Sequence, residues 1–392
     1  MKSIPTKSYY LFIAVIIILN LQCFYLLNIS ITNAIVVPLE IIFFIFTFVT
    51  VKKEGKGKYN IEILFLLFIM LSSAYMASRT YGQSIVLGIL GQRFWIFSML
   101  MYFPISRLYR ASIVSIDGIF KVIDRINFIY IILIFTQFIL GTNHQFFQIM
   151  SNERNGSIRL YINISFLVLS FFWHLYKLLN NKNYKLDDLF FIFSTIAIYF
   201  LVIKSRMGLF SLIIAMILMI FLRKHSIKSI IIMLLFILVG LGLMRTNMIN
   251  AIIFKITGID AETTSDIVRS MAREKFMGEV FQTKLNTILG CGYVNTKDMN
   301  AFIQSGIEQG LNYNDVGIIG LIFYYGFLYP VWMVFIYVKA IIEGLNNQKF
   351  VIYFLLFGLL GIYTLLPGSY VTDISFALAL VMTEKKYKYM EQ

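Results

Sequence analysis

A short cationic segment lies between two apolar runs of the sequence. Lys204, Ser205 and Arg206 interrupt residues 198–224, which read IYFLVIKSRMGLFSLIIAMILMIFLRK. The apolar run on either side has a length that suits a membrane helix, so the three polar residues are predicted to form a tight hairpin between two helices. A charge close to a hydrocarbon layer is costly. Two positive charges in so short a connection therefore indicate a role that requires them.

A second pair of cations occurs later in the chain. Arg269 and Arg273 lie in SDIVRSMAREKFMGEVFQ, which is predicted to form a helix. Their i, i+4 spacing places them on one face of that helix. Two guanidinium groups on one face present planar forks of donors, which suit phosphate oxygens. The alternative is a solvated amphipathic helix whose arginines pair with Glu262, Asp266 or lipid phosphates.

The elements that must position these residues are predicted to be membrane helices. The chain has 392 residues, of which 59% are hydrophobic and 14% charged, and its mean hydropathy is +0.79. Too little polar surface remains to cover a soluble globule, so we expect an all-α integral membrane protein with one polytopic domain, residues 1–392. About twelve apolar runs have a suitable length: 9–28, 31–51, 61–78, 84–103, 126–140, 160–176, 188–203, 207–222, 229–245, 314–340, 350–366 and 370–383.

The charges of the loops predict the orientation of these helices. Most lysines and arginines lie in the two tails and in every second short loop, which places them on one and the same side of the predicted membrane helices. The positive-inside rule places these loops, and with them both termini, in the cytoplasm. Lys204 and Arg206 then lie on the outer side, against the rule. The long outer loop is residues 246–312, between the ninth and tenth helices, and it includes Arg269 and Arg273.

The same charge pattern bears on partners and cofactors. The net charge of +14 is explained by topology and by attraction to anionic lipid head groups, and no RNA motif combining aromatic and basic residues is present, so no nucleic acid is expected. Cys23 and Cys291 have neither disulfide nor metal-ligand spacing. The outer segments contain no carboxylate cluster suited to a metal. We therefore expect neither a metal nor a cofactor.

Several stretches together resemble a known family. They are the hairpin IKSRMGLFSL, the earlier outer loop SNERNGSIRLYINIS, and TILGCGYVNTKDMN followed by NYNDVGIIGLIFYYGFL. They are similar to the Wzy-type polysaccharide polymerases, relatives of the O-antigen ligases, which share a short SR hairpin and a long late outer loop. The chain lacks the histidine that the ligase branch places before the late helix, which favours a polymerase. Neither Arg154 nor Arg206 starts a strict arginine-ten-glycine repeat, so individual arginine roles stay open.

The resemblance implies a location and a reaction. The protein would lie in the bacterial cytoplasmic membrane as a membrane glycosyltransferase. It would transfer a growing glycan from a polyprenyl diphosphate to a sugar hydroxyl of the next lipid-linked repeat unit, on the outer face and without a nucleotide donor. Its implied partners are the polyprenyl-diphosphate-linked oligosaccharide, membrane lipid, a chain-length regulator and a flippase. Capsule, exopolysaccharide and O-antigen are not distinguished.

The implied reaction also assigns a role to the cations. A departing diphosphate develops negative charge, which preorganised cations stabilise in a water-poor cavity. Arg206 is expected to supply part of this charge from its tight hairpin. The remaining charge is expected from arginines that converge on it from separate loops: Arg154 or Arg159, and Arg269 or Arg273.

A proton acceptor is needed as well, because the acceptor hydroxyl must lose its proton. Asp315 is the candidate base, since it opens the tenth predicted helix on the outer side. The alternative is that Asn314 or Asp315 simply caps that helix. His144, Glu153 and Glu262 are weaker candidates that nothing in their spacing excludes.

Two further interpretations concern residues in and near the helices. Glu40 and Arg93 lie at matching depths in the second and fourth predicted helices, so a buried ion pair between them is predicted. A group of tyrosines near the proposed site is suited to stacking on sugars: Tyr293, Tyr313, Tyr324 and Tyr325.

Other function classes also fit parts of the pattern. A flippase for lipid-linked oligosaccharides would need cations for the same diphosphate, but it would line its cavity with charges deep in several helices. A ligase-type transferase would use the same donor, and a purely structural membrane protein would need none of the outer arginines. Alanine substitution of Arg154, Arg206, Arg269 and Arg273 separates that last reading from an enzyme.

Overall fold

The computed structural model describes residues 6–52, 55–142, 144–149, 151–154, 157–180, 185–221, 264–360 and 374–384. Its elements in chain order are α1 (Thr6–Asn20), η1 (Gln22–Tyr25), α2 (Ile29–Thr50), α3 (Asn60–Tyr81), α4 (Ile85–Leu100), α5 (Tyr102–Arg110), α6 (Ile116–Leu140), β1 (Ser151–Arg154), β2 (Ser157–Leu160), α7 (Ser165–Asn180), α8 (Leu186–Ala197), η2 (Ile198–Ile203), α9 (Arg206–Phe221), α12 (Thr264–Phe281), α13 (Lys284–Leu289), α14 (Met299–Gln304), η3 (Ile307–Gln309), η4 (Tyr313–Val316), α15 (Ile318–Tyr325), α16 (Leu328–Asn346), α17 (Lys349–Leu360) and α18 (Ile374–Thr383).

As far as the structure describes it, the chain is a multi-pass, all-α membrane protein apart from one small hairpin. Within the described ranges, six helices are long and apolar enough to cross a membrane: Ser30–Thr50, Asn60–Tyr81, Ile85–Arg110, Ile116–Leu140, Leu186–Ile203 and Leu328–Asn346. Shorter apolar helices accompany them, among them α1, α17 and α18. The count of twelve and the sidedness stay predictions. The predicted helix 229–245 and residues 246–263 lie outside the described residues.

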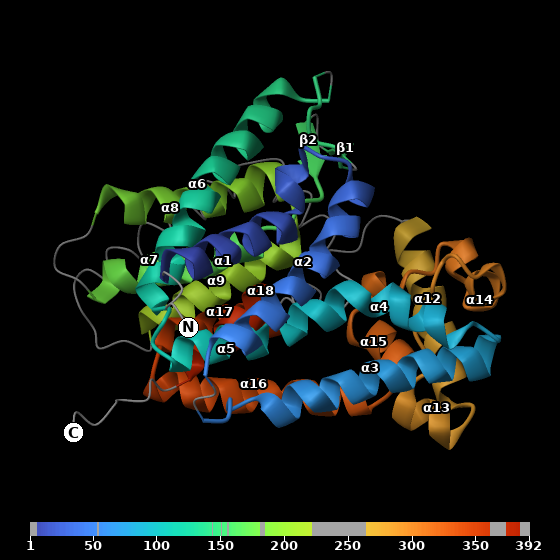
Figure 1. The fold of residues 1–392 in the computed structure, drawn as a ribbon. Helices are drawn as coiled ribbons and strands as arrows, with labels where there is room; N and C mark the ends of the chain where they lie inside the picture. The colour runs from blue at the N-terminus through green and yellow to red at the C-terminus, as the bar shows by residue number, and fades with distance from the viewer. Residues whose placement is uncertain are drawn as a thin grey trace.

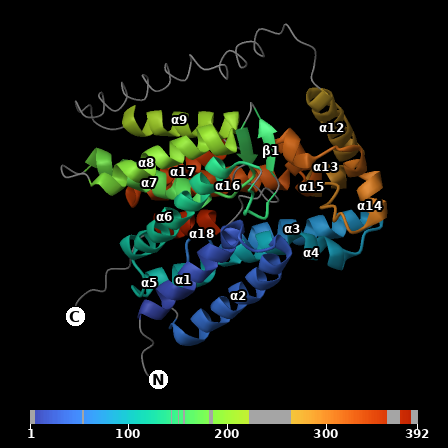
Figure 2. The same ribbon diagram turned by 90° about the horizontal axis from the view of Figure 1, so that it is seen from above.

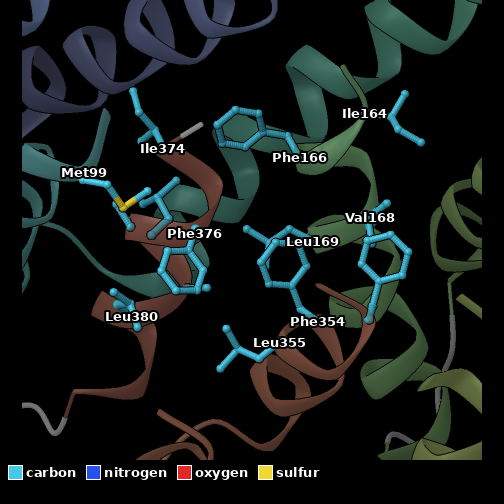
Figure 3. Packing of buried hydrophobic residues seen from close by; sticks show 14 of the residues in the cluster. Met99, Ile164, Phe166, Val168, Leu169, Phe354, Leu355, Ile374, Phe376 and Leu380 are labelled. Carbon is cyan, nitrogen blue, oxygen red and sulfur yellow. The ribbon is translucent and has the colours of Figure 1, made fainter. Parts of the chain in front are cut away.

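The helices form one bundle with its apolar side chains both inside and on the surface. Every residue of α18 is buried, and Figure 3 shows its Phe376 beside Leu169 of α7 and Phe354 of α17. The outer faces of the long helices are also apolar, since Ile61 is 78% and Ile139 81% exposed. A surface of this kind suits contact with lipid chains rather than with water.

One part of the predicted outer segment folds as a separate lobe, residues 264–316, which we call the α12 lobe. Figures 1 and 2 place α12, α13 and α14 together at one end of the bundle, beside α3, α4 and α15. Phe276 of α12 stacks on Phe323 of α15 with their ring centroids 4.2 Å apart. The backbone N–H of Cys291 donates to the carbonyl of Phe323 at 2.7 Å. The α12 lobe is therefore packed against the helices of the bundle.

The predicted tenth helix, 314–340, is wrong as a continuous helix. The structure divides it into η4, α15 and α16, with breaks at Gly317 and Gly326. Gly326 has a φ of +67°, and a Cβ atom there would lie 2.1 Å from the carbonyl oxygen of Ile288. The backbone of α13 approaches so closely at this point that only glycine fits, and the helix ends where the contact occurs.

The predicted first helix, 9–28, ends early for a different reason. After α1 ends at Asn20, residues 22–25 have positive φ angles and form the short turn η1. Hydrogen bonds from distant segments hold this turn: the N–H of Gln148 donates to the Tyr25 carbonyl at 2.7 Å, and the N–H of Asn163 donates to Tyr25 Oη at 2.7 Å. The turn η1 thus holds the chain on both sides of the β-hairpin, because Gln148 precedes β1 and Asn163 follows β2.

Candidate functional site

The stretch SNERNGSIRL, which belongs to a predicted outer loop, contains two strands that pair as an antiparallel β-hairpin. Strand β1 pairs with β2 so that Asn152 lies opposite Arg159 and Arg154 lies opposite Ser157. The chain leading into the hairpin is anchored as well, because Gln137 Oε1 accepts from the N–H of Phe146 at 2.8 Å. The hairpin therefore presents Arg154 and Arg159 from a fixed backbone. The side chain of Arg154 lies outside the described part of the structure.

The KSR segment forms the tight hairpin that the sequence predicts. Helix α8 ends in the π-helical turn η2, and Lys204 follows in the left-handed conformation with a φ of 51°. Ser205 Oγ then accepts from the N–H of Gly208 at 3.2 Å, so it caps α9. π-Helical turns and left-handed non-glycine residues are both uncommon and concentrate at functional sites. Arg206, whose side chain is outside the described part, is the first residue of α9.

Gly208 explains how this turn is kept tight. A Cβ atom at Gly208 would lie 2.6 Å from the Tyr199 ring and 3.2 Å from Ser205 Oγ. The first turn of α9 therefore packs directly on η2. Lys204 is only 7% exposed, so its charged side chain is held within this packing and does not extend freely into water.

Arg159 joins the β-hairpin to the KSR turn. Its Nε donates to the carbonyl of Ile203 at 3.0 Å, and its Cζ lies 4.6 Å from the centroid of the Tyr161 ring. Strand β2 packs against η2 along this contact. The structure thus gathers four basic residues on two connected turns, and we call them the hairpin cations: Arg154, Arg159, Lys204 and Arg206. Within the described side chains, Arg159 has no carboxylate partner.

The other predicted site residues lie in the α12 lobe. Arg273 is exposed and Arg269 half-buried on α12, and Asp315 is exposed on η4, which packs against α12. The N–H of Asp315 donates to the carbonyl of Asn312 at 3.1 Å. Asp315 therefore belongs to a 3₁₀ turn separated by Gly317 from α15, so it does not open a continuous tenth helix.

The predicted site residues consequently form two groups instead of one. Figure 1 shows the strands of the hairpin cations at the top of the view and α12 with α15 at the right, well apart. Arg159 lies with Lys204 and Arg206, whereas Arg269 and Arg273 lie with Asp315. Glu262, a weaker candidate base, lies outside the described residues, and Glu153 lies on β1 between Asn152 and Arg154.

The α12 lobe also contains a polar cluster that sequence reasoning missed. Tyr81 Oη donates to Glu279 Oε2 at 2.9 Å, and Lys275 Nζ lies 3.8 Å from Glu279 Oε1. Burial raises the pKa of Glu279, and the hydrogen bond from Tyr81 and the charge of Lys275 act in the opposite direction. No sequence signal links Tyr81 to Glu279, because they lie in α3 and α12.

The predicted Glu40–Arg93 ion pair is wrong. Glu40 is 1% exposed, and among the residues that the structure describes neither of its carboxylate oxygens has a hydrogen-bond partner. Arg93 Nη1 instead donates to the carbonyl of Leu90, and its Cζ lies 4.3 Å from the Phe94 ring centroid. Although α2 and α4 pack together, the long arginine side chain lies along its own helix.

No protein-family model, no curated protein and no solved structure matches this chain. Among the described residues, no group of three or more histidine, cysteine, aspartate or glutamate side chains is placed to hold a metal ion. The geometry of the cations is thus the main basis for a functional proposal.

Proposed function

We propose that this protein polymerises polyprenyl-diphosphate-linked oligosaccharide repeat units by glycosyl transfer at the outer face of the bacterial cytoplasmic membrane. The observation that carries the proposal is the contact between Arg159 and Ile203. It joins two loops that both carry arginines and that both contribute to the resemblance to the Wzy-type polymerases. A membrane protein that places four basic residues on two connected turns has a local field suited to an anionic head group.

The chemistry explains why cations are needed there. The acceptor hydroxyl attacks the anomeric carbon of the donor sugar, a new glycosidic C–O bond forms, and the C–O bond to the diphosphate breaks. The diphosphate leaves with the electron pair, so its charge grows in the transition state. In this proposal Arg206, the first residue of α9, and Arg159 from the hairpin stabilise that charge, and the dipole at the N-terminus of α9 adds to the effect.

The acceptor hydroxyl must give up its proton to a base. Asp315 remains the candidate that the sequence favours, and its exposed carboxylate on η4 is open to a substrate. Glu153 is the second candidate, because its backbone lies on the same strand as Arg154. The two candidates imply different arrangements. A base at Glu153 lies on the same hairpin as two of the hairpin cations, whereas a base at Asp315 requires the substrate to bring the hairpin cations and the α12 lobe together.

A reconstitution experiment tests the proposal. The purified protein is placed in liposomes with a lipid-linked repeat unit, without nucleotides or metals, and the products are separated on a gel. We expect a ladder of polymer that disappears in Arg206→Ala and persists in Lys297→Ala, a control that removes an exposed charge from the α12 lobe. Asp315→Ala and Glu153→Ala then show which carboxylate is required.

Other results would point to other functions. Movement of the glycolipid across the bilayer without a ladder would contradict the proposal and favour a flippase. A single transfer to a different lipid acceptor would favour a ligase-type transferase. An undiminished ladder in Arg206→Ala would remove Arg206 from the mechanism.

A further inference from the structure

A compact group of tyrosines lies at the junction of the α12 lobe and the bundle. The ring of Tyr324 on α15 has Tyr293 at 5.1 Å and Tyr313 at 4.3 Å, measured between centroids. Tyr324 is 2% exposed, whereas Tyr293 and Tyr313 are partly exposed. The buried ring thus supports two rings that reach the surface, one from the segment after α13 and one from η4. We call Tyr293, Tyr313 and Tyr324 the tyrosine platform.

The backbone under the platform is fixed by buried side chains. Ser73 Oγ accepts from the N–H of Tyr293 at 2.9 Å and donates to the carbonyl of Tyr324 at 2.7 Å. Gln83 Nε2 donates to the carbonyl of Tyr293 at 3.0 Å. Both Ser73 and Gln83 are fully buried. The polar groups of the Tyr293 backbone are therefore satisfied from α3 and the residues after it, which holds the ring in one place.

Close glycine contacts fix the ring of Tyr293 and the backbone of Tyr313 on the other side. A Cβ atom at Gly91 of α4 would lie 2.6 Å from Cε1 of Tyr293, and one at Gly320 of α15 would lie 2.1 Å from the carbonyl oxygen of Tyr313. The two surface tyrosines thus rest directly on helix backbones. A binding surface that is already rigid loses little conformational entropy when a ligand binds.

Two charged residues accompany the platform. Arg93 interacts electrostatically with Tyr293: burial raises the pKa of the tyrosine, and the arginine charge acts in the opposite direction. Asp315 follows Tyr313 on η4 and is exposed. Within the described side chains, Arg93 has no carboxylate partner. The surface therefore combines aromatic faces with one cationic and one anionic side chain.

We infer that the tyrosine platform binds a glycan by stacking pyranose rings on Tyr293 and Tyr313, with Arg93 and Asp315 available to the sugar hydroxyl groups. A pyranose presents an apolar C–H face and a rim of hydroxyls, which matches aromatic faces bordered by charged donors and acceptors. The inference rests on the proposed function, because it makes the platform a subsite for the saccharide of the same substrates. Its separation from the hairpin cations suits an extended oligosaccharide whose far end lies away from the diphosphate.

A binding measurement tests this without requiring turnover. The probe is the water-soluble oligosaccharide that mild acid releases from the lipid-linked glycan of the cells in which this protein naturally occurs. Saturation-transfer NMR on the full-length protein in detergent reports which sugar ring protons contact it. We expect transfer with the wild-type protein and about a tenfold weaker affinity in Tyr293→Ala and in Tyr313→Ala.

Matched variants separate binding from folding. Tyr293→Phe and Tyr313→Phe keep the ring face and should keep most of the affinity. Gly91→Ala should displace the Tyr293 ring and weaken binding, whereas Gly278→Ala, where nothing lies within 4 Å of the added atom, should not. Arg206→Ala should bind the probe normally, because the probe carries no diphosphate.

The outcomes are distinct for the two proposals. Either of two results would overturn the glycan surface: no saturation transfer with the wild-type protein, or a wild-type affinity in both alanine variants. A polymer ladder would still establish the enzyme in that case. Tyrosine-dependent binding without any ladder would support the surface and contradict polymerisation. Loss of binding in the phenylalanine variants, with unchanged melting temperatures, would contradict stacking as the source of affinity.

Discussion

The cations at the two ends of the helix bundle have different environments. At the end where α3 begins and α18 ends, Lys58 pairs with Glu343, Lys339 pairs with Glu62, and Arg110 Nε lies 3.6 Å from Glu384 Oε2. At the hairpin cations, Arg159 contacts a carbonyl oxygen and an aromatic ring. Paired charges cancel each other's field and serve to fix helices, whereas a cation without a carboxylate keeps its field available for an anionic ligand.

Glu384 is the centre of the paired end. Its carboxylate accepts from Tyr102 Oη, from Ser106 Oγ at 2.9 Å and from the N–H of Lys58 at 3.2 Å, and the residue is 2% exposed. These groups come from the start of α3, from α5 and from the end of α18. A buried carboxylate with this many donors ties distant parts of the chain together. The comparison predicts structural effects at this end and functional effects at the other.

The largest expected effect is on activity at the hairpin cations. Arg159→Ala should reduce the rate of polymer formation about 10²–10³-fold, as loss of one preorganised donor to a developing anion does. Its melting temperature should change little, because the side chain is partly exposed and its described contacts are one carbonyl oxygen and the Tyr161 ring. Gel quantification of polymer from matched amounts of protein checks this. A large loss of stability with normal specific activity would reverse the comparison.

The next effect is on stability at Glu384. Glu384→Ala should destabilise the protein by about 3 kcal/mol, because it leaves buried donors of Tyr102 and Ser106 and the charge of Arg110 without their acceptor. Thermal unfolding in detergent measures this, and Glu384→Gln, which still accepts hydrogen bonds, should lose less. An unchanged melting temperature in Glu384→Ala would mean that the paired end does not stabilise the fold.

A smaller effect is expected from pH at Glu279, the carboxylate that is paired at the α12 lobe. Its folded-state pKa is raised by burial above the ordinary value of 4.5, so the folded state holds the proton more tightly than the unfolded state. This contribution to stability is fully present below the unfolded pKa and is lost as pH rises from there through the folded pKa.

A melting curve measured across that range should therefore decline more in the wild-type protein than in Glu279→Gln, which cannot ionise. Tyr81→Phe removes a hydrogen bond that lowers the pKa of Glu279, so it should move the decline to higher pH. Identical pH profiles in all three proteins would exclude Glu279 as the titrating group.

The smallest effect is expected from the exposed pair Lys58–Glu343. The two side chains are 38% and 23% exposed, so water and salt screen their attraction. A double-mutant cycle with Lys58→Ala and Glu343→Ala should give a coupling of about 0.5 kcal/mol that falls at high salt. A coupling energy as large as the effect of Glu384→Ala would show that the exposure of an ion pair at this end does not determine how much the pair contributes to stability.

The sequence predicted the features that depend on neighbours along the chain. Apolar runs of sufficient length predicted the long helices α2 and α3, whereas α6 begins ten residues before the predicted run 126–140, and the KSR segment forms the tight hairpin expected between two helices. Both depend on local composition, because a membrane helix satisfies its own backbone groups.

Contacts between distant segments were not predictable in the same way. The break at Gly326 depends on the approach of Ile288 from α13, and the Tyr81–Glu279 bond joins α3 to α12. The Glu40–Arg93 pair failed because matching depth does not fix the direction of a long side chain. The division of the arginines into two groups likewise depends on how β2 packs against η2, which no spacing in the sequence specifies.

The central claim is that the hairpin cations bind a diphosphate, and the most direct test is ligand-induced stabilisation. The melting temperature of the purified protein is measured with farnesyl diphosphate and with farnesol. A ligand at about 100 times its Kd stabilises a folded protein by about 2.7 kcal/mol. We predict that the diphosphate raises the melting temperature of the wild-type protein and Lys297→Ala but not of Arg159→Ala or Arg206→Ala. An equal rise in all four proteins, or an equal rise with farnesol, would contradict the claim.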